Sequence, residues 1–225
     1  MKKFLCLILS LILVGCSQTG SLDTQELKIG EHGASYYDGI LRYGVVLKNN
    51  SENAVSMKPA IKVYAKDEKG QIIASATHYA SYVLPNDHTY FGDSLKCAKK
   101  PDHVDFEVKT KKWTALSDLK RVIKRDSFDV NVKSRVNDDE DHHYYRGTIT
   151  NKSRYHANNV EVVLIFKKNK KIVFVSRVNI GALKADETKA FTTIMDSHFE
   201  YDALSFYGQV KNVEKAYQVL SLFYI

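Results

Sequence analysis

Tyr43-Gly44-Val45-Val46-Leu47-Lys48-Asn49-Asn50-Ser51 is repeated in pattern by Tyr145-Arg146-Gly147-Thr148-Ile149-Thr150-Asn151-Lys152-Ser153, 102 positions later. Each stretch is an apolar run that ends in Asn-x-Ser. Further pairs follow in the same order along the chain, which indicates a duplicated unit. They match Ile61–Ala65 with Val162–Phe166, Leu84–Thr89 with Leu183–Thr188, and Phe106–Val108 with Phe206–Gly208.

The matched blocks predict an all-β protein. Each is a short run rich in Val, Ile, Tyr, Phe and Thr, bounded by Asn, Asp, Gly or Pro. Polar turns at 66–70 and 167–170 join neighbouring runs as hairpins. Since a unit of about 100 residues has the size of an immunoglobulin-like sandwich, we predict two tandem β-sandwiches, over 27–112 and 126–225.

The order of these blocks resembles the FxLYD-type domain, an immunoglobulin-like β-sandwich of bacterial envelope lipoproteins. The naming motif corresponds to Ile61-Lys62-Val63-Tyr64 and to Val163-Leu164-Ile165-Phe166, and its closing Asp is displaced to Asp67 in the first copy. The resemblance implies a structural module and carries no catalytic residue to this chain.

The N-terminus predicts export and lipid anchoring. Met1-Lys2-Lys3 precedes an apolar run over 4–13, which is too short to span a bilayer as a stable helix. The ending Leu13-Val14-Gly15-Cys16 resembles a bacterial lipobox. This resemblance implies that 1–15 are a lipoprotein signal peptide, that Cys16 carries diacylglycerol and palmitate, and that 16–26 are a tether. We therefore expect a lipid-anchored protein on the extracytoplasmic face of the cell membrane.

Composition restricts the class of protein. The 225 residues include 44% hydrophobic and 26% charged side chains, which excludes a disordered, collagenous or coiled-coil chain. Three cysteines cannot form a disulfide framework. Once Cys6 is removed and Cys16 acylated, Cys97 is the remaining thiol, and we predict a small, partly buried apolar residue rather than a nucleophile.

Residues 113–125 are predicted to be a basic linker between the sandwiches. Leu116, Leu119 and Ile123 recur at helical spacing, with basic residues on the other side. Two interpretations remain: a short linker helix docked between the sandwiches, which we favour, or a basic stretch on an anionic membrane. The apolar end of the chain, 216–225, predicts a buried final strand.

A surface contact is predicted around the linker. Because the protein is exported, its basic cluster is expected to meet an envelope protein, lipid headgroups or anionic wall polymers, and no nucleic acid. The contact residues are Trp113, Lys120, Arg121, Lys124 and Arg125.

Two motifs resemble a catalytic site or a metal site, and for each of them we favour a structural interpretation. Gly92-Asp93-Ser94-Leu95 resembles the motif of GDSL esterases, but the repeat aligns it with the ordinary strand 191–194. Asp139, Asp141, His142 and His143 could be weak metal ligands, yet such a charge run is more typical of a solvated loop. The Asn-x-Ser sequences are interpreted as turns rather than glycosylation sites.

The sequence therefore predicts a non-catalytic binding or assembly module of the bacterial envelope, without a cofactor. One alternative is a solute- or ion-binding lipoprotein that serves a transporter, which requires a recess between the two copies. A remote alternative is a surface esterase at Ser94.

Overall fold

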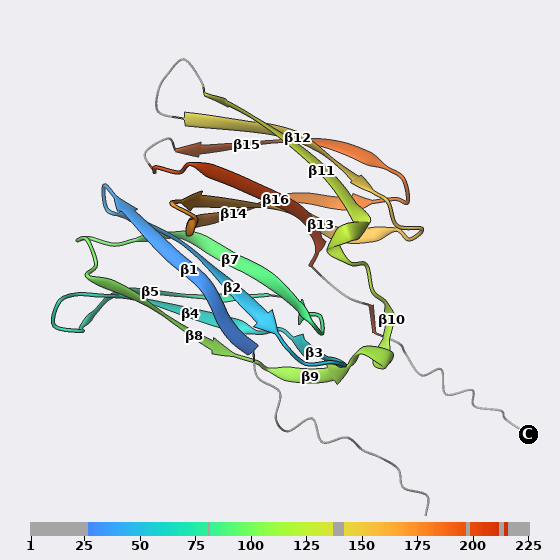
Figure 1. The fold of residues 1–225 in the computed structure, drawn as a ribbon, viewed down its shortest axis with the longest axis horizontal. Helices are drawn as coiled ribbons and strands as arrows, with labels where there is room; N and C mark the ends of the chain where they lie inside the picture. Colours follow the sequence, from blue (N-terminus) through green and yellow to red (C-terminus); the bar gives the residue numbers. More distant parts are fainter. Residues whose placement is uncertain (1–26, 81, 137–141, 197–198, 212–213, 216–225) are drawn as a thin grey trace, which may run out of the picture.

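The computed structural model describes residues 27–80, 82–136, 142–196, 199–211 and 214–215, and this part of the chain is all-β, as predicted (Figure 1). None of its helices is long and apolar enough to span a membrane. Three predicted features lie outside the described residues: the signal peptide (1–15), the tether (16–26) and the final strand (216–225).

The strands form antiparallel sheets that group by sequence into a first and a second sheet pair. The first sheet pair contains β1 (Leu27–Tyr37), β2 (Ile40–Asn49) and β7 (Asp87–Lys96) in one sheet, and β5 (Ile72–Tyr79), β4 (Ala60–Lys66) and β8 (His103–Lys109) in the other. The second sheet pair contains β11 (Phe128–Val136), β12 (His142–Asn151) and β15 (Thr188–Asp196), and β14 (Lys171–Leu183), β13 (Ala157–Lys168) and β16 (Ala203–Val210). Two small sheets are β6 (Tyr82–Val83), β3 (Ala54–Met57) and β9 (Lys112–Ala115), and β10 (Leu119–Arg121) with β17 (Glu214–Lys215).

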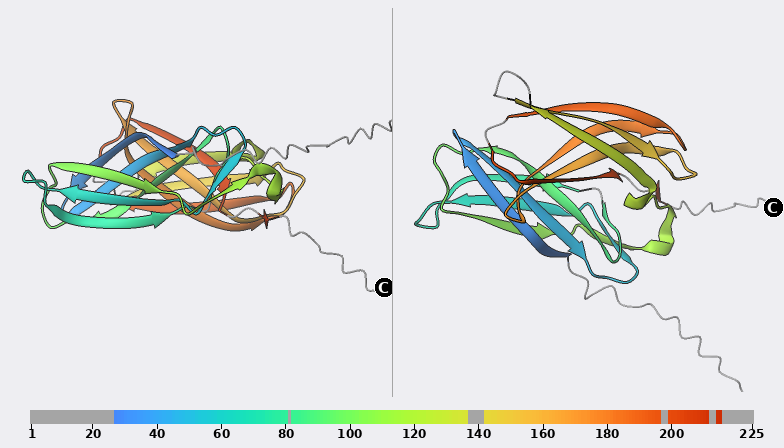
Figure 2. Two further views of the ribbon diagram at one scale, coloured as in Figure 1. Left: turned by 90° about the horizontal axis from the view of Figure 1, so that it is seen from below. Right: turned by 45° about the horizontal axis from the view of Figure 1, so that its top comes forward.

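The four large sheets stack as four layers (Figures 1 and 2). The outer sheets are β5-β4-β8 and β11-β12-β15, and the inner sheets are β1-β2-β7 and β14-β13-β16. Strand order is the same in corresponding sheets of the two pairs, in line with the sequence repeat. Each pair encloses a hydrophobic core, with Tyr43 and Val63 in the first and Tyr145 and Leu164 in the second.

The inner sheets pack on each other in what we call the inner interface. Val46 of β2 meets Val163 and Ile165 of β13 and Val175 of β14 there. Both β2 and β13 are therefore buried on both faces, which explains why they are nearly continuous apolar runs rather than alternating ones. Burial of each such Val or Ile side chain stabilises the fold by about 1.5–3 kcal/mol.

A row of glycines makes this close approach possible. Gly33, Gly44 and Gly92 are cross-strand neighbours in one inner sheet. A Cβ at Gly33 would lie 1.9 Å from the Ile172 carbonyl oxygen, and one at Gly92 would lie 2.5 Å from that of Val175. Only glycine leaves room for β14 at these positions.

The corresponding row of the second sheet pair has different residues. Lys133, Arg146 and Thr192 occupy the equivalent cross-strand positions in the outer sheet β11-β12-β15, and all three side chains are exposed. Because these side chains occupy the face of the outer sheet, another sheet cannot approach it as closely as β14 approaches the glycine row.

The Asn-x-Ser sequences lie where strands end, and the first asparagine of each is buried and hydrogen-bonded, which confirms the turn interpretation. The Asn49 amide donates to the carbonyl oxygens of Ala54 (2.8 Å) and Val83 (2.9 Å). In the second copy, Asn151 donates to those of Tyr155 (2.8 Å) and Leu183 (3.2 Å). Both asparagines are at most 1% exposed, so each satisfies buried carbonyl groups where strands end.

The predicted linker helix is wrong. Residues 113–125 contain the end of β9, the 3-10 turn η1 (Leu116–Asp118), β10 and the start of η2 (Arg125–Ser127). The apolar residues do not share a helical face: Leu119 packs on Val55 and Leu84, whereas Ile123 packs on the second core. Leu116, by contrast, is 37% exposed. The three residues therefore have three different environments, although their spacing in the sequence is that of a helix.

Candidate functional site

A cavity of about 230 Å³ lies where the two sheet pairs meet. Its walls come from 79–89 of the first sheet pair, from β13, β14 and β16 of the second, and from Ile123 and Arg125 between them. This is a recess between the two copies, which the solute-binding alternative requires.

Glu161 is the most deeply buried charged side chain of the cavity wall, at 1% exposure. Val160 and Val162 beside it face the second core, so alternation along β13 turns Glu161 towards the inner interface. Gln209 Nε2 donates to Glu161 Oε1 at 2.5 Å, and Lys211 Nζ lies 3.0 Å from Oε2. Such partners are required because an unpaired buried carboxylate costs several kcal/mol.

Arg177 of β14 is a partly buried cation beside Glu161. Its Nη1 lies 3.4 Å from Glu161 Oε1, its Nη2 donates to the carbonyl of Tyr90, and its guanidinium stacks 4.7 Å above the ring centroid of Phe91. Two buried atoms of this group have no hydrogen-bond partner among the described residues: Arg177 Nε, and Glu161 Oε2, whose contact with Lys211 is an ion pair without hydrogen-bond geometry. Glu161 Oε2 is therefore held by its ion pair with Lys211, and Arg177 Nε is the atom of this group that has neither a hydrogen bond nor an ion pair among the described residues.

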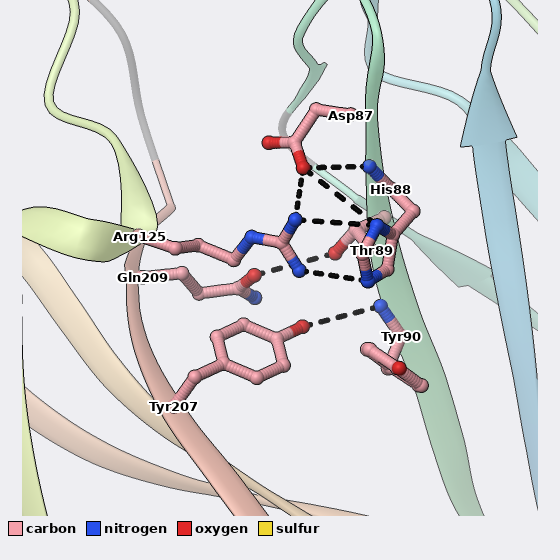
Figure 3. Close-up of polar contacts among 7 residues, drawn as sticks. All are labelled: Asp87, His88, Thr89, Tyr90, Arg125, Tyr207 and Gln209. Carbon is pink, nitrogen blue, oxygen red and sulfur yellow. Dashed lines mark hydrogen bonds and ion pairs between the residues drawn. The ribbon is translucent and has the colours of Figure 1, made fainter.

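Arg125 of η2 joins the cavity wall to β7 (Figure 3). Its Nη2 pairs with the carboxylate of Asp87, and its Nη1 lies 3.0 Å from His88 Nε2. The guanidinium also lies over the ring of Tyr207, 5.1 Å from the centroid. Arg125 is thereby held between strands of both sheet pairs.

Two further hydrogen bonds connect the sheet pairs beside Arg125 (Figure 3). Thr89 Oγ1 donates to Gln209 Oε1 at 3.3 Å, and the Tyr90 backbone N–H donates to the Tyr207 hydroxyl at 3.3 Å. Gln209 therefore links Thr89 to Glu161, because its amide nitrogen donates to that carboxylate.

Burial and charge set the protonation of the site. Burial, followed by the nearby Arg125 charge, lowers the pKa of His88, which favours a neutral ring. Burial raises the pKa of Tyr207 to about 12, so its hydroxyl stays protonated. The charged groups of the wall are then the cations Arg125, Arg177 and Lys211 and the anions Asp87 and Glu161, an excess of one positive charge.

The predicted contact residues have different surroundings. Trp113 is half-buried on the first core, and Arg121 lies 5.5 Å above the ring of Tyr155. Lys120 is exposed. Lys124 and Arg125 line a second recess, a groove of about 470 Å³ whose apolar wall contains Leu84, Leu116 and Val122.

Ser94 lies on β7, opposite Arg42 of β2, and not on the strand-to-helix turn that the esterase resemblance implies. Its backbone N–H donates to Asp93 Oδ1 at 2.7 Å. The histidine near Asp93 is His78, whose Nδ1 lies 3.6 Å from Asp93 Oδ2 and whose Nε2 bonds to the Tyr43 hydroxyl. These contacts tie β5 to the inner sheet.

Only two of the four weak metal-ligand candidates lie within the described residues. Asp139 and Asp141 lie outside the described residues, whereas His142 and His143 begin β12. His143 packs its ring beside Tyr145 and Tyr201. Within the described segments, no group of three or more His, Cys, Asp or Glu side chains could hold a metal ion.

Sequence reasoning missed Glu161, Arg177, Gln209 and Lys211. One signal was available: Glu161 is a lone charge inside the apolar run Val160–Phe166, and a charge in a buried strand requires partners. The identity of those partners depends on how the inner sheets are aligned, which no local pattern shows.

Comparisons with known proteins identify no family. The sequence matches no protein-family profile and no curated protein. Among solved structures, a red sea bream transglutaminase matches with a TM-score of 0.27 and 11% identity, over 76% of this chain and 27% of that chain. A beta-glucuronidase from glycoside hydrolase family 2 matches with a TM-score of 0.24 and 12% identity, over 80% of this chain and 21% of that one. The chain thus spans about a quarter of their length, and matches this weak assign no function.

Proposed function

We propose that this protein is a lipid-anchored binding protein of the bacterial envelope that holds a small anionic or zwitterionic solute in the cavity between its sheet pairs. One observation carries the proposal: the buried carboxylate of Glu161, paired with Lys211 and Arg177, lies in the wall of a cavity between the sheet pairs. Buried charges are costly unless they are paired, and a polar solute in the cavity can add hydrogen bonds to these charged groups.

The chemistry of the solute follows from the wall. A carboxylate or phosphate can accept from Arg177 and Lys211, and an amine or hydroxyl can donate to Glu161. The excess positive charge favours an anionic or zwitterionic ligand over a cation. The cavity, at about 230 Å³, is smaller than the roughly 300 Å³ at which drug-sized pockets begin, so a small solute suits it.

This proposal reverses the order of the sequence predictions, in which assembly ranked above solute binding. Assembly remains a second candidate because Lys124 and Arg125 border the apolar groove of Leu84, Leu116 and Val122. A photocrosslinker at Leu116 in living cells tests it. One dominant envelope protein is the expected product, and an unselective adduct pattern contradicts the assembly role.

Native mass spectrometry of the membrane-purified chain is the direct test of solute binding, followed by titration with amino acids, carboxylates and phosphate esters. We expect one bound small molecule. Glu161→Gln should weaken the binding of a solute that donates an amine or hydroxyl to Glu161 about 10- to 100-fold, since a hydrogen bond to a charged group contributes about 1.5–3 kcal/mol. Glu187→Gln, at a partly exposed turn remote from the cavity, is the control.

Lys211→Gln provides a second variant, because Lys211 is 41% exposed and its loss threatens folding less. Binding that neither Glu161→Gln nor Lys211→Gln weakens, or the absence of any bound or titratable solute, would overturn the proposal. The anchor is tested separately: Cys16→Ser should move the chain from the membrane to the soluble fraction and abolish labelling with radioactive palmitate.

A further inference from the structure

Strand β5 is an edge of the first sheet pair. Its hydrogen-bonded neighbour among the described residues is β4. On its inner side, His78 faces Asp93 of β7. Within the described part of the chain, the other side of its backbone pairs with no strand, and such an edge is a template for another strand.

The β5 edge carries a β-bulge near its start but no charged residue or proline. Ile72–Tyr79 has no Lys, Arg, Asp, Glu or Pro, and the uncharged stretch extends from Gly70 to Asn86. By contrast, charged residues occur in most other edge strands of the two sheet pairs, namely β1, β7, β8, β11, β14 and β15. The remaining edge strand, β16, is also uncharged and contacts β11 and η2, whereas β5 contacts β7.

A β-bulge gives β5 an unusual outer face. Ala65 of β4 pairs with Ala74 and the next residue, Lys66, pairs with Ile72, so Ile73 is the extra residue. Ile72 therefore shares a face with Ser75, Thr77 and Tyr79, and all four side chains are exposed. Ile72 and Tyr79, at opposite ends of this row, are 56% and 71% exposed.

From this pattern we infer that β5 pairs antiparallel with β5 of a second copy of the chain, about a two-fold axis at Ala76. With the bulge counted, Tyr79 then lies opposite the partner's Ile72, and Thr77 lies opposite the partner's Ser75. Each of the most exposed apolar side chains of β5 is thereby covered by the other. The sheets would join in the order β8-β4-β5-β5-β4-β8.

A second copy fits this edge better than a charged peptide does. An isologous contact requires a strand complementary to itself, and the β5 row places no like charges opposite each other. The outer face of β4 beside it carries Lys62 and Lys66, cross-strand from Glu107 and His103. Since these polar side chains stay in water, pairing extends the sheet sideways and does not cover its face.

Sedimentation velocity of the full chain in detergent is the test, over a concentration series. The wild type should be dimeric at the higher concentrations. Thr77→Lys should raise the dissociation constant at least tenfold, and adding Ser75→Glu should restore pairing because the introduced ammonium group then faces the introduced carboxylate of the partner. Thr192→Lys, at an exposed strand threonine remote from β5, is the matched control.

Disulfide trapping tests the register. The double variant Ile72→Cys with Tyr79→Cys should form a covalent dimer, whereas Ile72→Cys with Thr77→Cys should not. A wild type that stays monomeric, a dimer unaffected by Thr77→Lys, or trapping in the second register would overturn the inference. Because Tyr79 also lines the cavity, Glu161→Gln distinguishes the two proposals: it removes the buried charge without changing β5, and it should leave the dimer intact.

Discussion

Ile172 of β14 lies directly over Gly44 of β2, so closely that a Cβ at position 44 would be 2.5 Å from Ile172 Cγ2. The same Cβ would be 2.7 Å from Val175 Cγ2. Both distances are far below van der Waals contact, so a side chain at position 44 would force β14 away from β2. The close approach at Gly44 is therefore part of the observed alignment of the two sheet pairs. The charged cavity exists because of this alignment, since its walls come from both pairs.

Gly44→Ala is expected to destabilise the protein by about 1–3 kcal/mol, the usual cost of overpacking a filled interior. The free energy of unfolding in urea measures the effect. Gly30→Ala is the control because its nearest neighbour is the flexible end of Lys48. Equal free energies of unfolding for the two variants would show that β14 can move away from Gly44 without loss of stability.

Asn49→Ala is expected to cost about 1–3 kcal/mol, since it leaves the carbonyl groups of Ala54 and Val83 buried without their donor. Asn151→Ala should have a similar effect in the second sheet pair. Thermal unfolding gives the comparison, with the exposed Asn50→Ala as control. If the Asn49→Ala and Asn151→Ala variants were as stable as the control, water would be replacing the asparagine amide as the donor to these carbonyl groups.

Stability should fall as the pH decreases through about 6.5, the ordinary pKa of histidine. Burial lowers the pKa of His78 and of His88 in the folded chain, so below this pH the unfolded chain binds protons that the folded chain does not. The window extends from about 6.5 down to the lowered folded pKa values. Urea unfolding at several pH values above about 5, where most carboxylates stay ionised, measures the slope.

Replacing both histidines by glutamine should flatten that slope. His156→Gln, at an exposed position, should leave it unchanged. An unaltered slope in the double variant would assign the pH dependence to other groups.

Cys97 should react with a maleimide only when the protein opens. It is 2% exposed and packs with Leu41 and Ala65, and its thiol donates to the Lys99 carbonyl at 3.1 Å. Labelling of Cys97 in the folded chain should be slow and should accelerate across the urea transition, whereas an engineered Thr192→Cys should react at once. Fast labelling of Cys97 in the native protein would contradict its burial.

The strands, the Asn-x-Ser turns and the burial of Cys97 could be predicted because each depends on local pattern. The stacking of the inner sheets could not. Its signals were the apolar runs 43–47 and 160–166, which a single sandwich would have interrupted with polar residues, and we interpreted them as ordinary strands.

The cavity escaped prediction for the same reason. Asp87, Glu161 and Lys211 are far apart in sequence, and only the glycine row of Gly33, Gly44 and Gly92 brings their strands together. Arg125 was singled out as a surface contact from charge alone, but it pairs with Asp87 inside the molecule.

Lys133, Arg146 and Thr192 also decide how long such a stack can become. The inner interface joins two different surfaces, a glycine-lined face and an apolar one, and a heterologous contact of this kind propagates into a filament when every unit carries both. In this chain each surface occurs once, because the equivalent positions of the outer sheets hold Arg146 in place of Gly44 and Lys62 in place of Val163. The duplicated units therefore differ where identity would have made them polymerise, and face-to-face growth ends at two.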